Sequence, residues 1–284
     1  MKIASALAVS LLGLAAPMAH AACPSDAAVA AYFEDYKAAR ESQGLGDDLT
    51  LEEARCSREK LARLLQAELG TPVGYKAAFT NPAIWERFKV KGPEWAYMFG
   101  KHMYPSGTTV SPKIGANLLF EADMVAVVKD AGLATAETPL QALQHISHFV
   151  PFIEMPDAMR ATAGAGPALV ATNIIFRGGV LGSRIDVQPT QAFLDSLADT
   201  TMVMTEDKSG KELARAKGSA LMGNPAASAL WLAKALREAG IAVKPGDLLS
   251  LGSFNVPVPP EPGTTVSVRF QGLPNTPSAT VNFQ

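Results

Sequence analysis

Residues 118–128 constrain the fold more than any other part of the chain, because this apolar run contains two acidic residues. Its length and its valines are typical of a buried strand. Side chains alternate between the two faces of a strand, so Glu121 and Asp123 are expected to share one face. Two neighbouring carboxylates in apolar surroundings are costly unless one is protonated or a cation lies between them. The run therefore predicts a site for a hard cation such as Mg²⁺ or Mn²⁺, and the alternative is a half-exposed edge strand with two solvated acids.

Two further charged residues lie in apolar segments. Glu154 follows the run Phe149–Ile153 and is expected to complete the acidic set from a neighbouring element. Lys76 lies in the apolar segment 73–82, where burial would lower its pKa and suit it to act as a general base or an anion anchor. The alternative for Lys76 is a surface position, with the alkyl chain on the protein and the charge in solvent.

The composition is that of an ordinary soluble globular protein, with 284 residues, 48% hydrophobic residues, 18% charged residues and a net charge of −2. This length suits one large domain or a small domain joined to a larger one. The sequence has no basic patch and no zinc-finger spacing, so we expect no nucleic-acid partner. It also lacks GxGxxG, phosphate-loop and Gly-x-Ser-x-Gly motifs, so nucleotide binding and serine-hydrolase chemistry have no support.

Residues Met1–Ala21 are expected to form a secretory leader. Lys2 provides the positive charge, an apolar stretch follows, and Ala19-His20-Ala21 has the small-x-small pattern of a cleavage site. The leader predicts an exported protein, periplasmic in a bacterium. No later segment approaches the roughly 20 apolar residues of a membrane span, so we expect no span.

The two cysteines, Cys23 and Cys56, would then enter an oxidising compartment. A disulfide that ties the mature N-terminus to an early helix is the simplest expectation. Closing a loop of this length would stabilise the fold by about 3–4 kcal/mol. Two free thiols are the alternative.

Secondary-structure signals divide the mature chain into an N-terminal helical layer, residues 22–72, and a larger sheet-rich domain, residues 73–284. In the layer, Thr50 and Glu53 have the spacing of a capping box, which predicts a helix that ends at Gly70. In the larger domain we expect a hairpin over 200–216, a helix over 226–239, and strands over 264–270 and 280–283.

Three other features of the larger domain bear on a possible site. A helix from about Thr138 would carry His145 and His148 one turn apart, where such a pair binds metal less often than it lies on the surface. Asn173 lies in an apolar segment, so its amide needs partners from the backbone or from a ligand. A turn is expected at Gly178-Gly179.

Short motifs follow one another in a recognisable order along the mature chain. They are Gly74-Tyr75-Lys76-Ala77-Ala78-Phe79-Thr80, Phe120-Glu121-Ala122-Asp123, Pro151-Phe152-Ile153-Glu154, Asn173 with Gly182, Gly218-Ser219 with Gly223-Asn224-Pro225 and Trp231-Leu232-Ala233, and Pro245-Gly246-Asp247 with Gly252-Ser253. Taken together, they resemble the 2-oxo acid hydratase and decarboxylase branch of the fumarylacetoacetate hydrolase superfamily.

The resemblance implies a mixed α/β (α+β) fold, with a helical N-terminal layer on a strongly bent mixed β-sheet or β-roll. It implies that Glu121, Asp123 and Glu154 hold Mg²⁺ or Mn²⁺, which completes its coordination with water and with the 2-oxo and carboxylate oxygens of a small 2-oxo acid. Lys76 would bind the substrate carboxylate or shuttle protons. The same resemblance implies a catalytic role for Glu94 and substrate contacts for Asn173 and Ser219.

The implied activity is that of a lyase that enolises the oxo acid, with hydration of a C=C bond as the default reaction. Decarboxylation, C–C hydrolysis of an acylpyruvate and tautomerisation on the same site are alternatives, and a non-catalytic exported binding protein is a further one. Relatives of this kind are usually oligomers, so the resemblance implies a homo-oligomer.

The chain departs from the family pattern at positions that concern proton transfer. Pro93-Glu94-Trp95-Ala96 replaces a Pro-Asp-Phe-Gly-like stretch, and Thr172-Asn173-Ile174-Ile175 replaces an Asp-Asn-Ala-Ser-like one, which puts isoleucine in place of a hydroxyl. Leu251 stands where a threonine is common. The metal set is kept and the proton-transfer set is altered, which leaves the reaction open.

Overall fold

The structure is a computed structural model and describes residues 23–160 and 164–284. The leader predicted for Met1–Ala21 lies outside the described residues. In the part of the chain that the structure describes, no helix is both long enough and apolar enough to cross a membrane.

The chain alternates between short helices and strands. The helices are α1 (Asp26–Lys37), α2 (Leu51–Leu69), α3 (Trp85–Phe88), α4 (Pro139–Ala142), α5 (Gly166–Ala171), α6 (Gln191–Asp199) and α7 (Pro225–Glu238). The strands are β1 (Pro72–Ala78), β2 (Glu94–Phe99), β3 (Met103–Pro105), β4 (Thr109–Val110), β5 (Glu121–Val128), β6 (Ile146–Pro156), β7 (Phe176–Leu181), β8 (Ile185–Asp186), β9 (Thr201–Glu206), β10 (Lys211–Lys217), β11 (Leu248–Ser250), β12 (Thr265–Gln271) and β13 (Ser278–Phe283). The predicted hairpin, C-terminal helix and last two strands are thereby confirmed.

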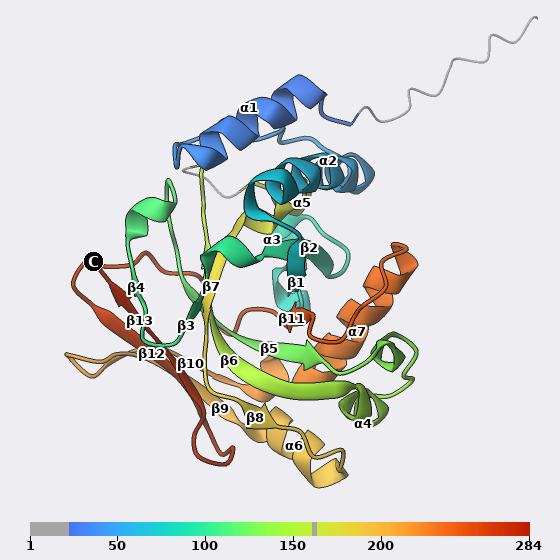
Figure 1. The fold of residues 1–284 in the computed structure, drawn as a ribbon, viewed down its shortest axis with the longest axis vertical. Coiled ribbons are helices and arrows are strands. Elements are labelled where there is room, and N and C mark those ends of the chain that lie inside the picture. The colour runs from blue at the N-terminus through green and yellow to red at the C-terminus, as the bar shows by residue number, and fades with distance from the viewer. Residues whose placement is uncertain (1–22, 161–163) are drawn as a thin grey trace, which may run out of the picture.

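Within the described residues, the strands form two sheets (Figure 1). The larger has the order β2-β1-β11-β5-β6-β7-β3, with β8 paired to β6, and the smaller has the order β10-β9-β12-β13-β4. β1 runs parallel to β11, whereas β5 runs antiparallel to both β11 and β6. The mixed α/β fold with a helical layer on a mixed sheet is therefore confirmed.

The main hydrophobic core lies between the larger sheet, the smaller sheet and α7, and it contains Ala122, Met124 and Ala126 of β5. These are alternate residues of the strand, so they share one face. Val125 and Val127 belong to a separate cluster on the opposite face. Burial of the first face thus turns the intervening residues of β5, the two acids included, away from the main core.

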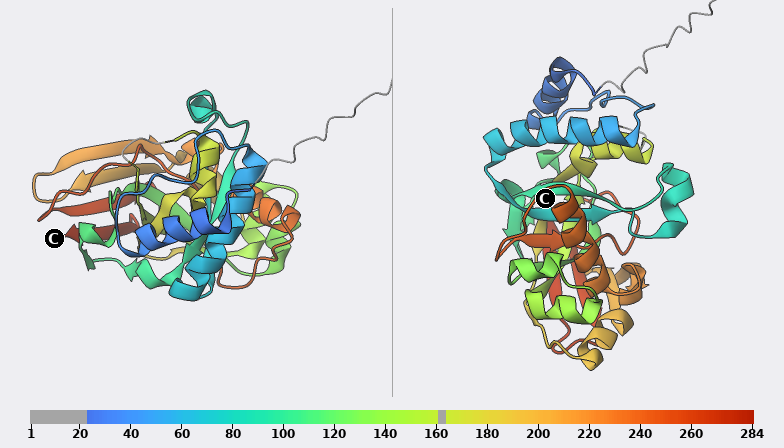
Figure 2. Two further views of the ribbon diagram at one scale, coloured as in Figure 1. Left: turned by 90° about the horizontal axis from the view of Figure 1, so that it is seen from above. Right: turned by 90° about the vertical axis from the view of Figure 1, so that its right-hand side faces the viewer.

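The helical layer lies at one end of the molecule, beyond β1, β2 and β7 (Figure 1), and the right-hand view of Figure 2 shows it from the side. The predicted capping box at the start of α2 is confirmed. The Thr50 hydroxyl accepts a hydrogen bond from the Glu53 backbone N–H at 3.2 Å, and the Glu53 carboxylate accepts one from the Thr50 N–H at 2.7 Å. α2 ends at Gly70, as predicted, where φ is +86°.

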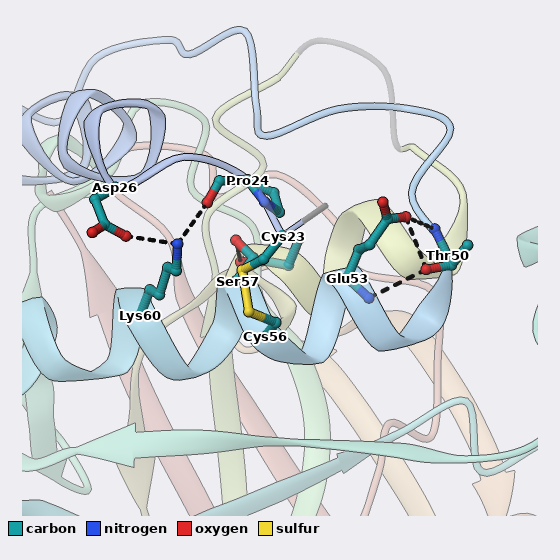
Figure 3. The surroundings of a disulfide bond; sticks show 9 residues. Cys23, Pro24, Asp26, Thr50, Glu53, Cys56, Ser57 and Lys60 are labelled. Carbon is teal, nitrogen blue, oxygen red and sulfur yellow. Dashed lines mark hydrogen bonds and ion pairs between the residues drawn. A yellow bond between two sulfur atoms is a disulfide. The ribbon is translucent and has the colours of Figure 1, made fainter. Parts of the chain in front are cut away.

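Cys23 and Cys56 are joined in the structure as a disulfide, with their Cα atoms 5.8 Å apart (Figure 3). Neighbouring contacts hold the same two segments together. The Lys60 ammonium donates to the carbonyl oxygen of Pro24 at 3.0 Å and forms an ion pair with Asp26 at 2.6 Å. The first described residues are therefore attached to the middle of α2.

The prediction that one helix carries both His145 and His148 is wrong. α4 begins after Thr138 as expected, but it ends at Ala142, and β6 begins at Ile146. Pairing of β6 with both β5 and β7 overrides the helical pattern of the sequence. His145 contacts Asp130 at 2.7 Å and His148 contacts Arg184 at 2.9 Å, so the two histidines have separate partners.

The prediction of a turn at Gly178-Gly179 is also wrong, because both residues lie inside β7. A Cβ atom at Gly178 would overlap His102, and one at Gly179 would overlap the ring of Phe152. The two glycines therefore permit close packing against neighbouring strands rather than a reversal of the chain.

Candidate functional site

Three acidic side chains meet on one face of the larger sheet. Glu121 of β5 lies directly opposite Glu154 of β6 in the antiparallel pair, and Asp123 follows two residues later on the same face. Such opposite residues have Cβ atoms about 5 Å apart, and diagonal neighbours are about 7–8 Å apart. β5 lies inside the sheet, and Glu121, Asp123 and Glu154 are 8%, 0% and 0% exposed. An edge strand with solvated acids is thus excluded.

β1 brings Lys76 to the same face of the sheet. Lys76 lies opposite Ser250 of β11, and Ser250 lies opposite Val125 of β5. The lysine is only 3% exposed, so a surface position is excluded. Its ammonium forms an ion pair with Glu154 and lies 3.5 Å from the carbonyl oxygen of Ile174.

Asp123 is held by the segment at the end of β11. The Ser250 hydroxyl donates to Asp123 Oδ2 at 2.5 Å, and the Gly252 N–H donates to the same oxygen at 3.2 Å. The Leu251 N–H donates to Oδ1 at 3.2 Å. Ser250 is fully buried and was not among the predicted site residues. Its position in a short strand after Pro245-Gly246-Asp247 was the available signal, but only the sheet register shows that it faces Asp123.

Burial and the neighbouring carboxylates change the ionisation of Glu121 and Asp123. Burial raises the pKa of Glu121 to about 8, and repulsion from Glu154 adds to the effect. Burial and the same repulsion raise the pKa of Asp123 to about 8, against the opposing effect of the Ser250 hydroxyl. For Lys76, burial would lower the pKa, but attraction by the carboxylates of Glu154, Glu121 and Asp123 outweighs burial and raises it. The expectation of a lowered Lys76 pKa was therefore wrong, because it left these neighbours out.

The donor set suits a hard divalent cation, since it consists of buried carboxylate oxygens. Among the described residues, no three acidic, histidine or cysteine side chains are already gathered around one point. Two contacts keep the carboxylates in separate positions. Glu154 forms an ion pair with Lys76, and Asp123 accepts a hydrogen bond from Ser250 at the end of β11. The backbone register still places the three acids as neighbours on one face of the sheet.

A cavity of about 520 Å³ opens onto this face, between the larger sheet, the helical layer and α5. Lys76 and Glu121 line it, whereas Asp123 and Glu154 lie behind them. Tyr32 from α1 contributes to the opposite wall. The helical layer, interpreted above as a separate N-terminal unit, therefore supplies part of the wall of the site.

A left-handed turn forms one wall of the cavity. Asn173, Ile174 and Ile175 have φ values of 56°, 46° and 48°, a region that β-branched residues rarely adopt. Ile174 and Ile175 line the cavity, and the Ile174 carbonyl faces Lys76. Strained backbone of this kind is maintained only where the surroundings impose it, and it clusters at functional sites.

Comparisons with known proteins find relatives over most of the chain. It is 26% identical over 208 residues to the 2-keto-4-pentenoate hydratase of Burkholderia vietnamiensis, covering 71% of this chain and 75% of that protein. It is 24% identical over 227 residues to the 4-oxalocrotonate decarboxylase of Pseudomonas sp. strain CF600, covering 80% and 84%. The fold matches the 4-oxalocrotonate decarboxylase from Pseudomonas putida G7, complexed with magnesium and adipate, with a TM-score of 0.79 at 20% identity, covering 91% and 97%. No family model matches the chain.

The chain is similar in sequence to enzymes named as 2-oxo acid hydratases and decarboxylases, and it shares the fold of a 4-oxalocrotonate decarboxylase. The resemblance stated from the motifs is therefore confirmed.

The positions at which the chain departs from the pattern of these relatives lie around the site. Ile175 faces the cavity, where the branch pattern has a hydroxyl. Leu251 is fully buried and contributes its backbone N–H to Asp123. Both substitutions leave the acids and Lys76 in place and remove polar groups beside them.

The other predicted site residues lie outside the cavity wall. The Asn173 amide bonds the backbone of Tyr97 in both directions, accepting from its N–H at 2.8 Å and donating to its carbonyl at 2.9 Å. The Glu94 carboxylate is bound by the Arg55 guanidinium at 2.5 Å and 3.2 Å. Ser219 is exposed in the turn before α7. The structure thus gathers Lys76 and the three acids, and it does not bring Asn173, Glu94 or Ser219 to them.

Proposed function

We propose that the protein is a divalent-metal-dependent enzyme that enolises a small 2-oxo acid, with hydration of a C=C bond as the default reaction. The observation that carries this proposal is the arrangement of Lys76 and Glu121 at the wall of an otherwise largely apolar cavity, directly in front of Asp123 and Glu154. The names of the hydratase and decarboxylase relatives support the same class of activity.

In this proposal, Glu121, Asp123 and Glu154 hold Mg²⁺ or Mn²⁺. The carboxylate donor set supports such an ion, as does the magnesium in the related decarboxylase structure. When bound, the ion acts as a Lewis acid toward the oxo and carboxylate oxygens of the substrate and so favours loss of a proton from the carbon next to the carbonyl.

The protein's own side chains provide positioning and exclusion of water. Lys76 Nζ carries N–H donors at the cavity wall, between Glu154 and the Ile174 carbonyl, which suits it to bind the substrate carboxylate. The Ser250 hydroxyl orients Asp123 through its hydrogen bond at 2.5 Å. Apolar walls around the remainder of the cavity limit the access of water to the reacting carbon.

Decarboxylation is the second candidate on the same site. The extent of the fold match to a 4-oxalocrotonate decarboxylase favours it, and so does Ile175, which puts an apolar side chain beside the cavity where hydration would use polar groups. Tautomerisation and C–C hydrolysis share the enolisation step. A non-catalytic binding protein would share the binding and lack proton exchange.

The experiment is hydrogen exchange at the carbon next to the carbonyl of a 2-oxo acid in deuterated water, followed by NMR. We expect exchange to require Mg²⁺ or Mn²⁺ and to fall by a factor of about 100 or more in Glu121→Gln. Glu212→Gln, at an exposed acid of β10, is the matched control. Equal exchange in wild type and Glu121→Gln would contradict the proposal, and release of carbon dioxide would distinguish decarboxylation from hydration.

We also propose that the protein acts outside the cytoplasm, as a homo-oligomer. The leader pattern and the disulfide between Cys23 and Cys56 support export. Fractionation of cells and light scattering of the purified mature protein test the two statements, and retention of the full-length chain in the cytoplasm would contradict the first.

A further inference from the structure

We propose that the substrate is a 2-oxo acid with an extended apolar tail, alkyl or aryl, rather than a short or doubly charged oxo acid. This inference rests on the proposed function, since it takes the oxo acid head to bind beside Lys76 and Glu121. The inference adds the chemical class of the part of the substrate beyond this oxo acid head.

The cavity is much larger than the head of an oxo acid requires. Its volume of about 520 Å³ lies within the range of about 300–1,000 Å³ of pockets that hold drug-sized ligands. Filled with solvent alone, it would hold on the order of 15 water molecules at about 30 Å³ each. A ligand that ended near Lys76 and Glu121 would leave most of this space to water.

The walls beyond the head are largely apolar, and their apolar residues come from several elements. Phe79 follows β1, Phe88 belongs to α3, Leu119 precedes β5, Met159 follows β6, and Leu169 belongs to α5. Water against such walls lacks hydrogen-bond partners, so its displacement by an apolar group is favourable. The geometry therefore points to an apolar occupant.

The apolar lining continues to the surface at Val256. This residue lines the cavity and is 72% exposed, which makes it an exception among the large apolar side chains of the described residues. An exposed apolar side chain is ordinary by itself. Here it adds an apolar side chain to the exposed part of the cavity lining, where the end of a tail could contact it.

The two arginine side chains in the cavity lining would bind a second carboxylate of the ligand only weakly. Arg160 lines the cavity, but its guanidinium forms a two-pronged ion pair with Asp47. Arg87 lies in an exposed position, with its guanidinium 5.4 Å from the centre of the Phe88 ring. An ion pair with such an exposed arginine is worth little, because solvent screens it.

The test is calorimetric titration of the Mg²⁺-loaded protein with ligands that share one head: pyruvate, 2-oxooctanoate and 2-oxoadipate. We expect the dissociation constant to fall by about tenfold or more from pyruvate to 2-oxooctanoate, because each buried methylene contributes. We expect 2-oxoadipate to bind more weakly than 2-oxooctanoate. Leu169→Gln, in the wall, should reduce the ratio between pyruvate and 2-oxooctanoate, whereas Leu64→Gln, a half-buried leucine of α2 outside the cavity lining, should preserve it.

The possible results separate this inference from the proposed function. Binding of pyruvate with no gain from the octanoate tail, or with the same gain in Leu169→Gln, would overturn the inference and leave the proposed function standing. Tighter binding of 2-oxoadipate would overturn it in favour of a dicarboxylate substrate. Failure of every ligand to bind would remove the proposed function itself, and the inference with it.

Discussion

Lys76, at the wall of the cavity, forms a buried ion pair with Glu154 behind it, and the two side chains are only 4% and 1% exposed. The positive charge of Lys76 does not neutralise the site, because one ammonium faces three carboxyl groups on the same face of the sheet. Burial, together with this excess of acid, raises the pKa values of Glu121 and Asp123, and the excess of acid suits the site to a divalent cation.

Replacement of Lys76 by methionine should destabilise the metal-free protein by about 3–5 kcal/mol at neutral pH, because it leaves Glu154 buried without its partner. Lys60→Met is the matched control, since Lys60 pairs with Asp26, whose side chain is 89% exposed. This control should lose at most about 1 kcal/mol. Urea unfolding followed by circular dichroism measures both. Similar small losses in the two variants would show that the buried pair has no special role.

The left-handed turn predicts a difference between two neighbouring isoleucines. Asparagine tolerates positive φ far better than isoleucine, so either substitution relieves about 1–2 kcal/mol of backbone strain. Ile174 is 5% exposed, and Ile174→Asn should still be destabilising by about 2 kcal/mol or more, because its buried contacts are lost. Ile175 is only half-buried, and Ile175→Asn should change the free energy of unfolding by less than about 1 kcal/mol. A loss of about 2 kcal/mol or more in Ile175→Asn would argue against stored strain.

Reduction of the disulfide should lower the free energy of unfolding by about 3–4 kcal/mol, since the bond closes a loop between cysteines 33 residues apart. Unfolding in urea with and without a reductant measures the difference. The double variant Cys23→Ser, Cys56→Ser is the control and should not respond to the reductant. Two titratable thiols in the denatured, non-reduced protein would show that the bond does not form.

His102 should make the free energy of unfolding depend on pH in the acid range. Burial lowers the pKa of its imidazole, and the nearby Arg177 guanidinium lowers it further. Its buried Nδ1 has no hydrogen-bond partner among the described residues. A lowered folded-state pKa means that the unfolded chain binds the proton first, so stability is present above pH about 6.5 and is lost as the pH falls through the folded-state pKa. His102→Gln should therefore flatten the stability profile between pH 7 and pH 5, and an unchanged slope would contradict this account.

Local patterns were sufficient to predict much of the site. Alternation along residues 118–128 placed Glu121 and Asp123 on one face, and the capping box at Thr50 located the start of α2. Both signals depend on residues close together in the sequence, which is why they survive without knowledge of the fold.

Long-range pairing decided the remainder. The Ser250–Asp123 bond depends on β11 lying beside β5, and the raised pKa of Lys76 depends on acids from two other strands. His148 became a strand residue because it pairs with β5 on one side and with β8 on the other. Asn173 had two possible kinds of partner, and only the position of β2 shows that the backbone of Tyr97 satisfies its amide.

The most direct test of the central claim is calorimetric titration of the mature protein with oxalate, a planar mimic of a pyruvate enolate, with and without Mg²⁺ or Mn²⁺. The account predicts binding that requires the metal and that disappears in Glu121→Gln and in Glu154→Gln. Binding without any metal, unchanged binding in both variants, or no binding with either metal would contradict a metal and oxo acid site at these carboxylates.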